Sequence, residues 1–350
     1  MKRLSVIIPG YNTRRDWWVR CARSVSAAVV KACGEAGEVL CVDDGSREPV
    51  DTAWFEGIPG VKVIRLKKNA GLPTARNAGL KAATGEFVTF VDSDDEVREE
   101  TFAKCLLRME ETGADISVYG VQSVFVDFKL TAFDIPEDKY YGALTPKDVA
   151  YLVKRRLFYY MCNKVFRRSF LDVHNMWVEA DGVPCEDAIF NVGCVVNKAK
   201  WVTVAYPGYV YYRYDGTICS SYKPTLVAGM NKCSAAWKAY KDATPGAYEA
   251  LGNYDERSPQ TVACAQWMNI WRPRNPYTVS QKWRWLRENS ACLRGRPLLQ
   301  TSVVWCVAEF VRKAMFMWAR AHLYIRPVRR WFQIRGAKRI GTKFSPWDGK

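Results

Sequence analysis

Three aspartates follow directly after a short apolar run in the first third of the chain. Residues 87–91 are mostly apolar and end at Asp92, Asp94 and Asp95. A run of this length in front of an acidic cluster predicts a buried strand with carboxylates at its carboxyl end. Two carboxylates separated by one residue can bind the same hard divalent cation, which often shares its coordination shell with substrate phosphates. The stretch from Gly85 to Glu96 therefore predicts a site for a metal ion and a nucleotide diphosphate.

The elements that must position these aspartates alternate along the first hundred residues. Four apolar runs are predicted strands, and each ends in a loop rich in Asp, Asn, Gly or Tyr: Leu4 to Pro9, Val39 to Val42, Val61 to Leu66 and Phe87 to Val91. Segments 14–33 and 72–83 between them have helical character, and Pro73 suits a first helical turn. This alternation predicts a mostly parallel α/β sheet with its ligand crevice at the carboxyl ends of the strands.

The pattern is less regular after residue 98. Residues 160–171 favour a strand followed by a helix, and Glu186 and Asp187 lie where a loop is expected to enter a helix. Residues 202–213 predict two short strands, because Pro207 and Gly208 interrupt the apolar pattern. Helical patterns then dominate the rest of the chain.

The predicted organisation is an α/β domain at residues 1–222 and a mainly helical, basic region at 223–350. The formal net charge is +16. Lys282 to Lys350 contains 16 Lys and Arg residues but only three acidic residues. Almost all of the basic excess therefore lies in the tail, and an anionic partner is expected to bind there.

Composition and cysteine usage limit the class of protein. A hydrophobic fraction of 49% is ordinary for a soluble protein, and no apolar stretch reaches the roughly 18 residues that a membrane span needs. The 12 cysteines form no CxxC pair, which argues against a zinc framework and against a disulfide scaffold. The apolar run after residue 3 is too short for a signal peptide. We therefore expect a cytoplasmic protein.

Four motifs occur in a characteristic order: LSVIIPGYN at 4–12, VDDGS at 42–46, NAGLPTARNAGL at 69–80 and FVDSDD at 90–95. They closely resemble the motifs of the inverting glycosyltransferases of family 2, which have the GT-A fold. A weaker likeness continues through NKVFRRSFL at 163–171, CEDAIF at 185–190 and YYRYDGTICSSY at 211–222. The resemblance implies a GT-A-like, Rossmann-type sheet with flanking helices that binds a nucleotide-sugar.

The resemblance also implies which residues bind the nucleoside. Asp43 would accept a hydrogen bond from the base, and a carboxylate, which only accepts, suits the N–H edge of uracil. Pro9 and Tyr11 would line the base and ribose pocket, while Asn69 and Arg76 would add polar contacts. The expected donor is a UDP-sugar.

The same resemblance places the diphosphate at the acidic cluster. Asp94, supported by Asp92, would hold Mn²⁺ or Mg²⁺ on the diphosphate, and Ser93 would belong to the same donor site. The metal would neutralise the charge that grows on the leaving nucleotide as the glycosidic bond breaks. Arg213 would reach the diphosphate through a loop that closes over it.

An inverting transfer also needs a base that takes the proton from the acceptor hydroxyl. The Glu-Asp pair of the family corresponds to Glu186 and Asp187, and Asp187 is the expected base. Asn163 and Lys164 are expected to face the donor sugar or the acceptor.

Simpler structural roles remain open for many of these side chains. Asp43 and Asp44 could build the turn before Gly45. Asp95 could cap a following helix, as could the Glu-Asp pair at the later helix. Arg76 could be a surface residue of its helix.

The tail has two interpretations. It could be packed core with a solvated face, or it could contain an interfacial helix that binds an anionic membrane on its inner, cytoplasmic side. The interfacial interpretation depends on seven aromatic residues: Trp305, Phe310, Phe316, Trp318, Tyr324, Trp331 and Phe332. It depends equally on eight basic residues: Arg312, Lys313, Arg326, Arg329, Arg330, Arg335, Lys338 and Arg339.

Nucleic acid is not expected as a partner, because no known binding module is present. His174 and His322 are expected to be structural.

The sequence thus predicts a metal-dependent, inverting glycosyltransferase of hexosyl or N-acetylhexosaminyl type. It would move a sugar from a nucleotide-sugar to a hydroxyl of a saccharide or lipid-linked acceptor, in cell-surface polysaccharide or glycolipid synthesis. Two alternatives come from other classes. A nucleotidyltransferase would release pyrophosphate, and a noncatalytic nucleotide-sugar-binding protein at the membrane periphery would show no turnover.

Overall fold

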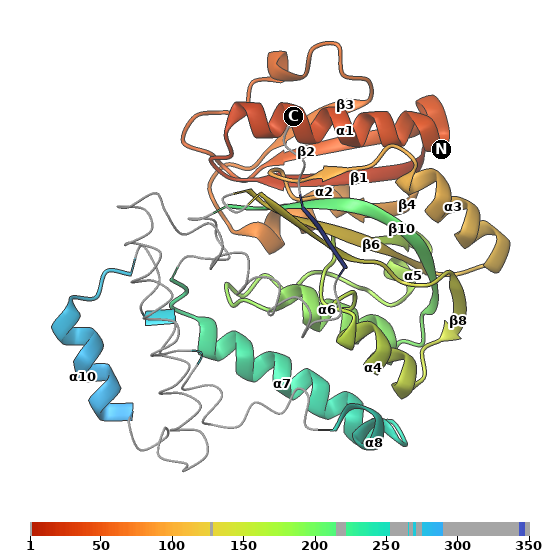
Figure 1. Ribbon diagram of the computed structural model, residues 1–350. Coiled ribbons are helices and arrows are strands. Elements are labelled where there is room, and N and C mark those ends of the chain that lie inside the picture. Colours follow the sequence, from red (N-terminus) through yellow and green to blue (C-terminus); the bar gives the residue numbers. More distant parts are fainter. Residues whose placement is uncertain are drawn as a thin grey trace.

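The computed structural model describes residues 2–126, 129–214, 222–252, 265, 269–270, 275–289 and 343–346. An eleven-stranded sheet runs through these residues, with helices on both faces (Figure 1). The aromatic and basic tail residues named above, from Trp305 to Arg339, lie outside the described part of the chain, as does His322. None of the described helices is long and apolar enough to cross a membrane.

The first half of the sheet is parallel, as predicted. Strands β1 (Lys2–Gly10), β2 (Gly37–Asp43), β3 (Val61–Arg65) and β4 (Gly85–Phe90) lie in the order β4-β1-β2-β3. Helices α1 (Arg15–Cys33) and α2 (Leu72–Ala82) provide crossovers between them. The carboxyl ends of β1, β2 and β4 therefore meet at the same edge, where the motif residues were expected to gather.

The second half of the sheet is mixed, which corrects the prediction of a mostly parallel sheet. Strand β9 (Lys164–Arg167) runs antiparallel both to β4 and to β6 (Ile116–Phe125). Strand β7 (Leu130–Asp134) also pairs antiparallel with β6, and β8 (Lys139–Ala143) pairs antiparallel with β10 (Lys200–Arg213). Strand β11 (Lys343–Pro346) pairs antiparallel with β7.

Residues 200–213 form one long strand, not the predicted pair. Strand β10 (Lys200–Arg213) runs parallel to β6 with a register shift between Val204 and Tyr209, and it also pairs with β5 (Glu96–Val97). Gly208 allows this continuous path, because an added Cβ would lie 2.5 Å from Thr101 Cγ2. The strand bends around the turn residues and does not end there.

Two apolar layers flank the sheet. Side chains alternate along β1, so that Leu4, Val6 and Ile8 face α1 and α3 (Thr101–Thr112), while Ile7 faces the opposite layer. The opposite layer contains α2, α4 (Pro146–Lys154), α5 (Arg168–Val173) and α6 (Glu186–Val196). Figure 1 shows α1 on one side of the sheet and α4 and α6 on the other.

The predicted helical character after residue 222 is found in the described part of that region. Helices α7 (Leu226–Ala243), α8 (Ala247–Leu251) and α10 (Val279–Asn289) lie there. Trp237 of α7 packs 5.2 Å from the ring of Phe158, and both rings belong to the core cluster beneath the sheet. The first helices beyond residue 222 therefore share a core with the α/β part, and the division at residue 222 stays a prediction.

Glu38 joins several parts of the parallel sheet. Its carboxylate accepts hydrogen bonds from Ser5 Oγ (2.8 Å), Thr84 N (2.9 Å) and Thr84 Oγ1 (2.7 Å), and it pairs with Lys62 Nζ at 3.0 Å. Burial raises the pKa of this carboxyl, but the hydrogen bonds from Thr84, Ser5 and Lys62 lower it to about 2. Because the folded pKa lies below the unfolded value, the charged group stabilises the fold above the unfolded pKa.

We expect Glu38→Gln to lower the free energy of unfolding by about 2 kcal/mol at neutral pH. The difference from wild type should shrink as the pH falls from about 4.5 towards 2, where Glu38 becomes protonated. Urea unfolding at a series of pH values measures it. Glu86→Gln is the matched control, since Glu86 is an exposed partner of Arg167 and its loss should cost less than about 1 kcal/mol. A pH-independent difference for Glu38→Gln would contradict this account.

Candidate active site

A buried arginine joins three carboxylates at the carboxyl edge of the parallel strands. Arg76, on α2, is 1% exposed. Its Nη1 donates to Asp187 Oδ1 at 2.5 Å and to Glu186 Oε1 at 3.4 Å, and its Nη2 donates to Asp92 Oδ1 at 3.1 Å. These four residues are called the Arg76 cluster below. The interpretation of Arg76 as a surface residue is therefore wrong.

The Arg76 cluster connects segments that are far apart in the sequence. Asp92 follows β4, whereas Glu186 and Asp187 form the first turn of α6. Burial lowers the pKa of Arg76, but Asp187, Asp92 and Glu186 together raise it above its ordinary value. One guanidinium thus balances three carboxylates, and it cannot be removed without leaving negative charges close together. The predicted contact between Arg76 and the nucleoside stays a prediction.

The loop Asp92–Asp95, called the DSDD loop below, follows β4 at the carboxyl edge of the parallel strands, and Asp92 and Asp94 are partly exposed there. Burial, followed by the charge of Asp92, raises the pKa of Asp94 to about 6. Burial also raises the pKa of Asp92. Arg76 lowers this pKa and the charge of Asp187 raises it, and the overall shift is upward. Within the described residues, no side-chain donor pairs with the Asp94 carboxylate. A nearby cation would therefore reduce the repulsion between Asp92 and Asp94, which Arg20 only partly offsets.

The donor set suits a divalent cation that is shared with a ligand. No group of three or more His, Cys, Asp or Glu side chains in the described part of the chain could hold a metal ion by itself. Asp92 and Asp94 could supply two hard oxygen ligands, and diphosphate oxygens and water would have to supply the rest, as is common for Mg²⁺ sites. The residues thus fit Mn²⁺ or Mg²⁺ bound together with a nucleotide diphosphate.

Asp95 does not cap a helix, which corrects that expectation. It is buried, its Oδ2 accepts from Tyr209 Oη at 2.7 Å, and its Oδ1 accepts from Tyr212 N at 2.8 Å. The residues that follow it form β5, not a helix. Asp95 therefore anchors the DSDD loop to β10, while Ser93 Oγ contacts Thr13 Oγ1 (2.8 Å) and joins the loop to the segment after β1.

Asp43, the predicted partner of the base, is fully buried and engaged by the protein. Its Oδ1 accepts from Ser46 N at 2.8 Å, and its Oδ2 accepts from Val50 N at 3.3 Å and from the Arg65 guanidinium. Burial raises the pKa of Asp43, but the contacts with Ser46, Val50 and Arg65 lower it overall. The predicted contact of Asp43 with the base stays a prediction, because the side chain is 0% exposed and three protein donors already contact it.

Asp44 helps to build the turn before Gly45, which was the structural alternative considered for this motif. It accepts hydrogen bonds from Ala70 N and Gly71 N, both at 2.9 Å, and so holds the loop after β3. Gly45 has φ +68°, and an added Cβ would lie 2.4 Å from the Lys68 carbonyl carbon. Only glycine allows this close approach. The turn therefore fixes the position of the neighbouring Asn69.

The remaining predicted nucleoside contacts lie at the same edge. Pro9 is buried near the end of β1, whereas Tyr11 is 42% exposed and Asn69 is exposed. The exposed side chains are free to meet a ligand, and their roles stay predictions.

Asp187 is oriented by two donors. Arg76 contacts its Oδ1, and Met161 N donates to its Oδ2 at 3.3 Å. About a quarter of the side chain remains exposed, at 26%. The N-cap residue of α6, Cys185, has φ +80°, which turns the chain into the helix and places both acids in its first turn. A fixed, partly exposed carboxylate is what a general base requires.

Asn163 and Lys164 do not face a ligand, which corrects that expectation. Both are 0% exposed. Lys164 Nζ donates to Leu157 O (2.9 Å), Phe158 O (3.1 Å), Tyr160 O and Asn163 Oδ1 (2.9 Å). Burial lowers the pKa of Lys164 to about 7. The pair instead fixes the backbone just before Met161, whose amide contacts Asp187.

Arg213 lies at the end of β10 and packs on aromatic rings. Its guanidinium carbon is 4.8 Å from the Tyr211 ring centroid and 5.2 Å from that of Phe125. Residues 215–221, which would form the predicted closing loop, lie outside the described residues. The contact of Arg213 with the diphosphate stays a prediction.

His174 packs on Phe170 with ring centroids 4.6 Å apart, as expected for a structural residue.

Sequence reasoning missed several partners of the motif residues. Arg65 could have been found, because the parallel register pairs it with Asp43 on the neighbouring strand. No sequence pattern indicates the contacts of Tyr209 and of the Met161 amide, since both groups bind residues that lie more than 20 positions away in the sequence.

Comparison with known proteins agrees with this geometry. The family model described as "Glycosyl transferase family 2" matches residues 5–174. The "Uncharacterized glycosyltransferase YibD" of Escherichia coli is 28% identical over 223 residues, covering 62% of this chain and 63% of YibD. The "Succinoglycan biosynthesis protein ExoO" of Rhizobium meliloti is 30% identical over 222 residues, covering 61% and 62%. The chain thus spans less than two thirds of the length of these relatives.

Solved structures show the same fold. The crystal structure of Staphylococcus aureus TarS 1–349 in complex with UDP-GlcNAc has a TM-score of 0.56 at 20% identity, covering 83% of this chain and 79% of that chain. The complex of TarS 1–349 with UDP gives 0.55 at 20% identity, covering 81% and 78%. TarS of the same species is named a poly(ribitol-phosphate) beta-N-acetylglucosaminyltransferase and is 25% identical over 214 residues, covering 60% of this chain and 35% of TarS.

Proposed function

The chain belongs to glycosyltransferase family 2 through its residues 5–174, and on that premise we propose that it transfers a sugar from a UDP-sugar to a hydroxyl group with inversion. The observation that carries the proposal is the Arg76 cluster, which brings the expected base, Asp187, together with Asp92 of the DSDD loop. Donor-binding and proton-accepting groups from two distant motifs therefore share one site.

A UDP-sugar is the favoured donor. TarS, which has the same fold, has been crystallised with UDP and with UDP-GlcNAc. In this chain, Asp43 offers only acceptor oxygens, and these suit the N–H edge of uracil. The acceptor class is a saccharide or polyol chain, as in the relatives named for succinoglycan synthesis and for poly(ribitol-phosphate). The biological context is the synthesis of a cell-surface polysaccharide or glycolipid.

The chemistry is a single displacement. The acceptor oxygen forms a bond to the anomeric carbon while the bond from that carbon to the diphosphate oxygen breaks, and the bonding electrons leave with UDP. Asp187 accepts the acceptor proton on an oxygen whose direction is fixed by Arg76 and Met161 N. Asp92 and Asp94 would hold Mn²⁺ or Mg²⁺, which supplies charge neutralisation for the leaving diphosphate when bound.

A donor screen tests the proposal. The purified protein is incubated with Mn²⁺ and, in separate reactions, UDP-glucose, UDP-GlcNAc, GDP-mannose and dTDP-glucose, and release of the free nucleoside diphosphate is measured. We expect turnover with a UDP-sugar. Turnover only with the GDP- or dTDP-sugar would overturn the donor assignment.

We also propose that the basic tail binds an anionic membrane surface, as its charge suggests. Five of its basic residues are changed together to Gln: Arg329, Arg330, Arg335, Lys338 and Arg339. At about 1 kcal/mol for each basic residue near such a surface, affinity for vesicles rich in phosphatidylserine should fall by roughly several thousandfold. Sedimentation with these vesicles measures it, and uncharged phosphatidylcholine vesicles are the control. Undiminished binding would show that the tail is not the membrane contact.

A further inference from the structure

A row of aromatic rings and arginines joins the beginning of α1 to the end of β10 beside the DSDD loop. The Trp17 and Tyr214 rings are stacked with centroids 4.9 Å apart, and Tyr214 lies next to Tyr212 at 6.2 Å. Arg14 lies 5.1 Å from the Trp17 ring and Arg20 lies 4.3 Å from the Tyr212 ring. Cations therefore cover both ends of a row of three rings, an arrangement that stabilises each contact.

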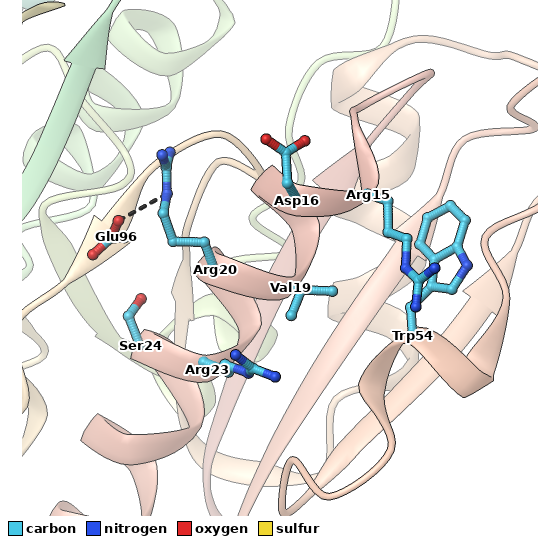
Figure 2. Close-up of a pocket in the computed structure, with 8 residues that line it drawn as sticks. All are labelled: Arg15, Asp16, Val19, Arg20, Arg23, Ser24, Trp54 and Glu96. Carbon is cyan, nitrogen blue, oxygen red and sulfur yellow. Dashed lines mark ion pairs between the residues drawn. The ribbon is translucent and has the colours of Figure 1, made fainter.

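Arg20 also contacts the DSDD loop itself. Its Nη2 donates to the main-chain oxygen of Asp94 at 2.6 Å, and its Nε forms an ion pair with Glu96 Oε1 at 2.8 Å. Its Nη1 donates to Tyr214 Oη at 3.4 Å. Figure 2 shows Arg20 reaching from α1 towards Glu96. One side chain thus connects α1, the DSDD loop and the end of β10.

The last two residues of the DSDD loop, Asp94 and Asp95, are anchored differently. Asp95 is held from β10 by Tyr209 and by the amide of Tyr212. Asp94 has no such side-chain anchor among the described residues, and Arg20 is the group that binds its carbonyl oxygen. Loss of Arg20 would therefore leave Asp95 in place while releasing the main chain at Asp94.

We propose that Arg20 is a positioning residue, which holds the main chain at Asp94 so that the carboxylates of Asp92 and Asp94 converge on one divalent cation. This inference rests on the proposed function. Replacing a residue that orients metal ligands without binding the metal typically weakens metal affinity by about 10- to 100-fold. The effect on nucleotide binding without metal should be small, because Arg20 touches none of the predicted nucleoside contacts.

The same surface offers a matched control. Arg20 and Arg23 both line an open pocket of about 800 Å³ on α1, together with Arg15, Val19 and Trp54 (Figure 2). Arg23 is exposed, and within the described residues no carboxylate lies within ion-pair distance of it. Replacing Arg23 therefore removes the same charge from the same helix without touching the DSDD loop.

The test measures Mn²⁺ binding to the protein saturated with UDP, by isothermal titration calorimetry, in wild type and in the variants Arg20→Met, Arg20→Lys and Arg23→Met. We expect Arg20→Met to weaken Mn²⁺ binding about tenfold or more, with UDP affinity in EDTA unchanged within about twofold. Arg23→Met should match wild type. Arg20→Lys should recover part of the affinity, because lysine keeps the charge but cannot bind the Asp94 carbonyl and Glu96 together.

Wild-type Mn²⁺ affinity in Arg20→Met, or an equal loss in Arg23→Met, would overturn the inference. If Arg20→Met fails to fold, Arg20→Lys takes its place, and wild-type affinity in that variant would overturn the inference as well. Failure of the wild-type protein to bind Mn²⁺ with UDP would instead overturn the metal-dependent function, and the positioning role with it.

Discussion

Replacing Asp187 by Asn is expected to abolish sugar transfer while nucleotide binding persists. The amide is almost the same size as the carboxylate and can still accept a hydrogen bond from Arg76, which now contacts Asp187 at 2.5 Å. It cannot accept the acceptor proton. General base catalysis contributes about 10²- to 10⁴-fold, so kcat should fall by at least about a hundredfold. Turnover of the UDP-sugar and UDP affinity, measured on the same preparation, check the result.

Glu186→Gln is the matched control for the base. Glu186 belongs to the same cluster but lies 3.4 Å from Arg76 and makes the weaker contact. We expect this variant to lose less than about tenfold in kcat, through a changed charge balance around Arg76. Unchanged turnover in Asp187→Asn would remove Asp187 from the mechanism. A larger loss in Glu186→Gln than in Asp187→Asn would identify Glu186 as the base.

The second large effect is expected at Asp94. Asp94→Asn removes a charge that the proposed cation needs, and metal stabilisation of a leaving diphosphate is worth several kcal/mol, so kcat should fall at least about a hundredfold. Thermal stability should not fall, because burial and the neighbouring Asp92 already disfavour the charged form of Asp94. Turnover measured across a range of Mn²⁺ concentrations, together with the melting temperature, tests both expectations.

Asp95→Asn provides the contrast for Asp94. Both oxygens of Asp95 accept hydrogen bonds from β10, at 2.7 Å and 2.8 Å, and the side chain is buried. Its replacement should therefore lower the melting temperature, whereas Asp94→Asn should not. If Asp94→Asn kept full turnover and an unchanged Mn²⁺ dependence, Asp94 could not be a metal ligand.

The parallel half of the fold and its motif loops could be predicted from the sequence. Apolar runs such as Val61 to Leu66 end at loop residues, and the βαβ alternation determines that these ends meet at one edge. The direction of β9 could not be predicted in the same way. Its four residues are too short for hydrophobic periodicity to distinguish parallel from antiparallel pairing.

The roles of single side chains were predictable only where they depend on short-range sequence. Asp92 and Asp94 follow a strand directly, so their position at the ligand edge followed from the strand itself. Burial of Lys164 could not be predicted, because three of its four acceptors are carbonyl oxygens of a backbone turn whose path no motif reveals. The pairing of Arg76 with Asp187 spans 111 residues and depends on where the fold places the first turn of α6.

The most direct test of the central claim follows the phosphorus products of the reaction. Phosphorus NMR of the wild-type protein with Mn²⁺, a UDP-sugar and a saccharide acceptor should show UDP appearing. Proton NMR of the product should show a β glycosidic bond when the donor is α-linked. The same protein given UTP and a sugar 1-phosphate should release no pyrophosphate. Pyrophosphate release in that mixture, or a product that retains the α configuration, would contradict the account.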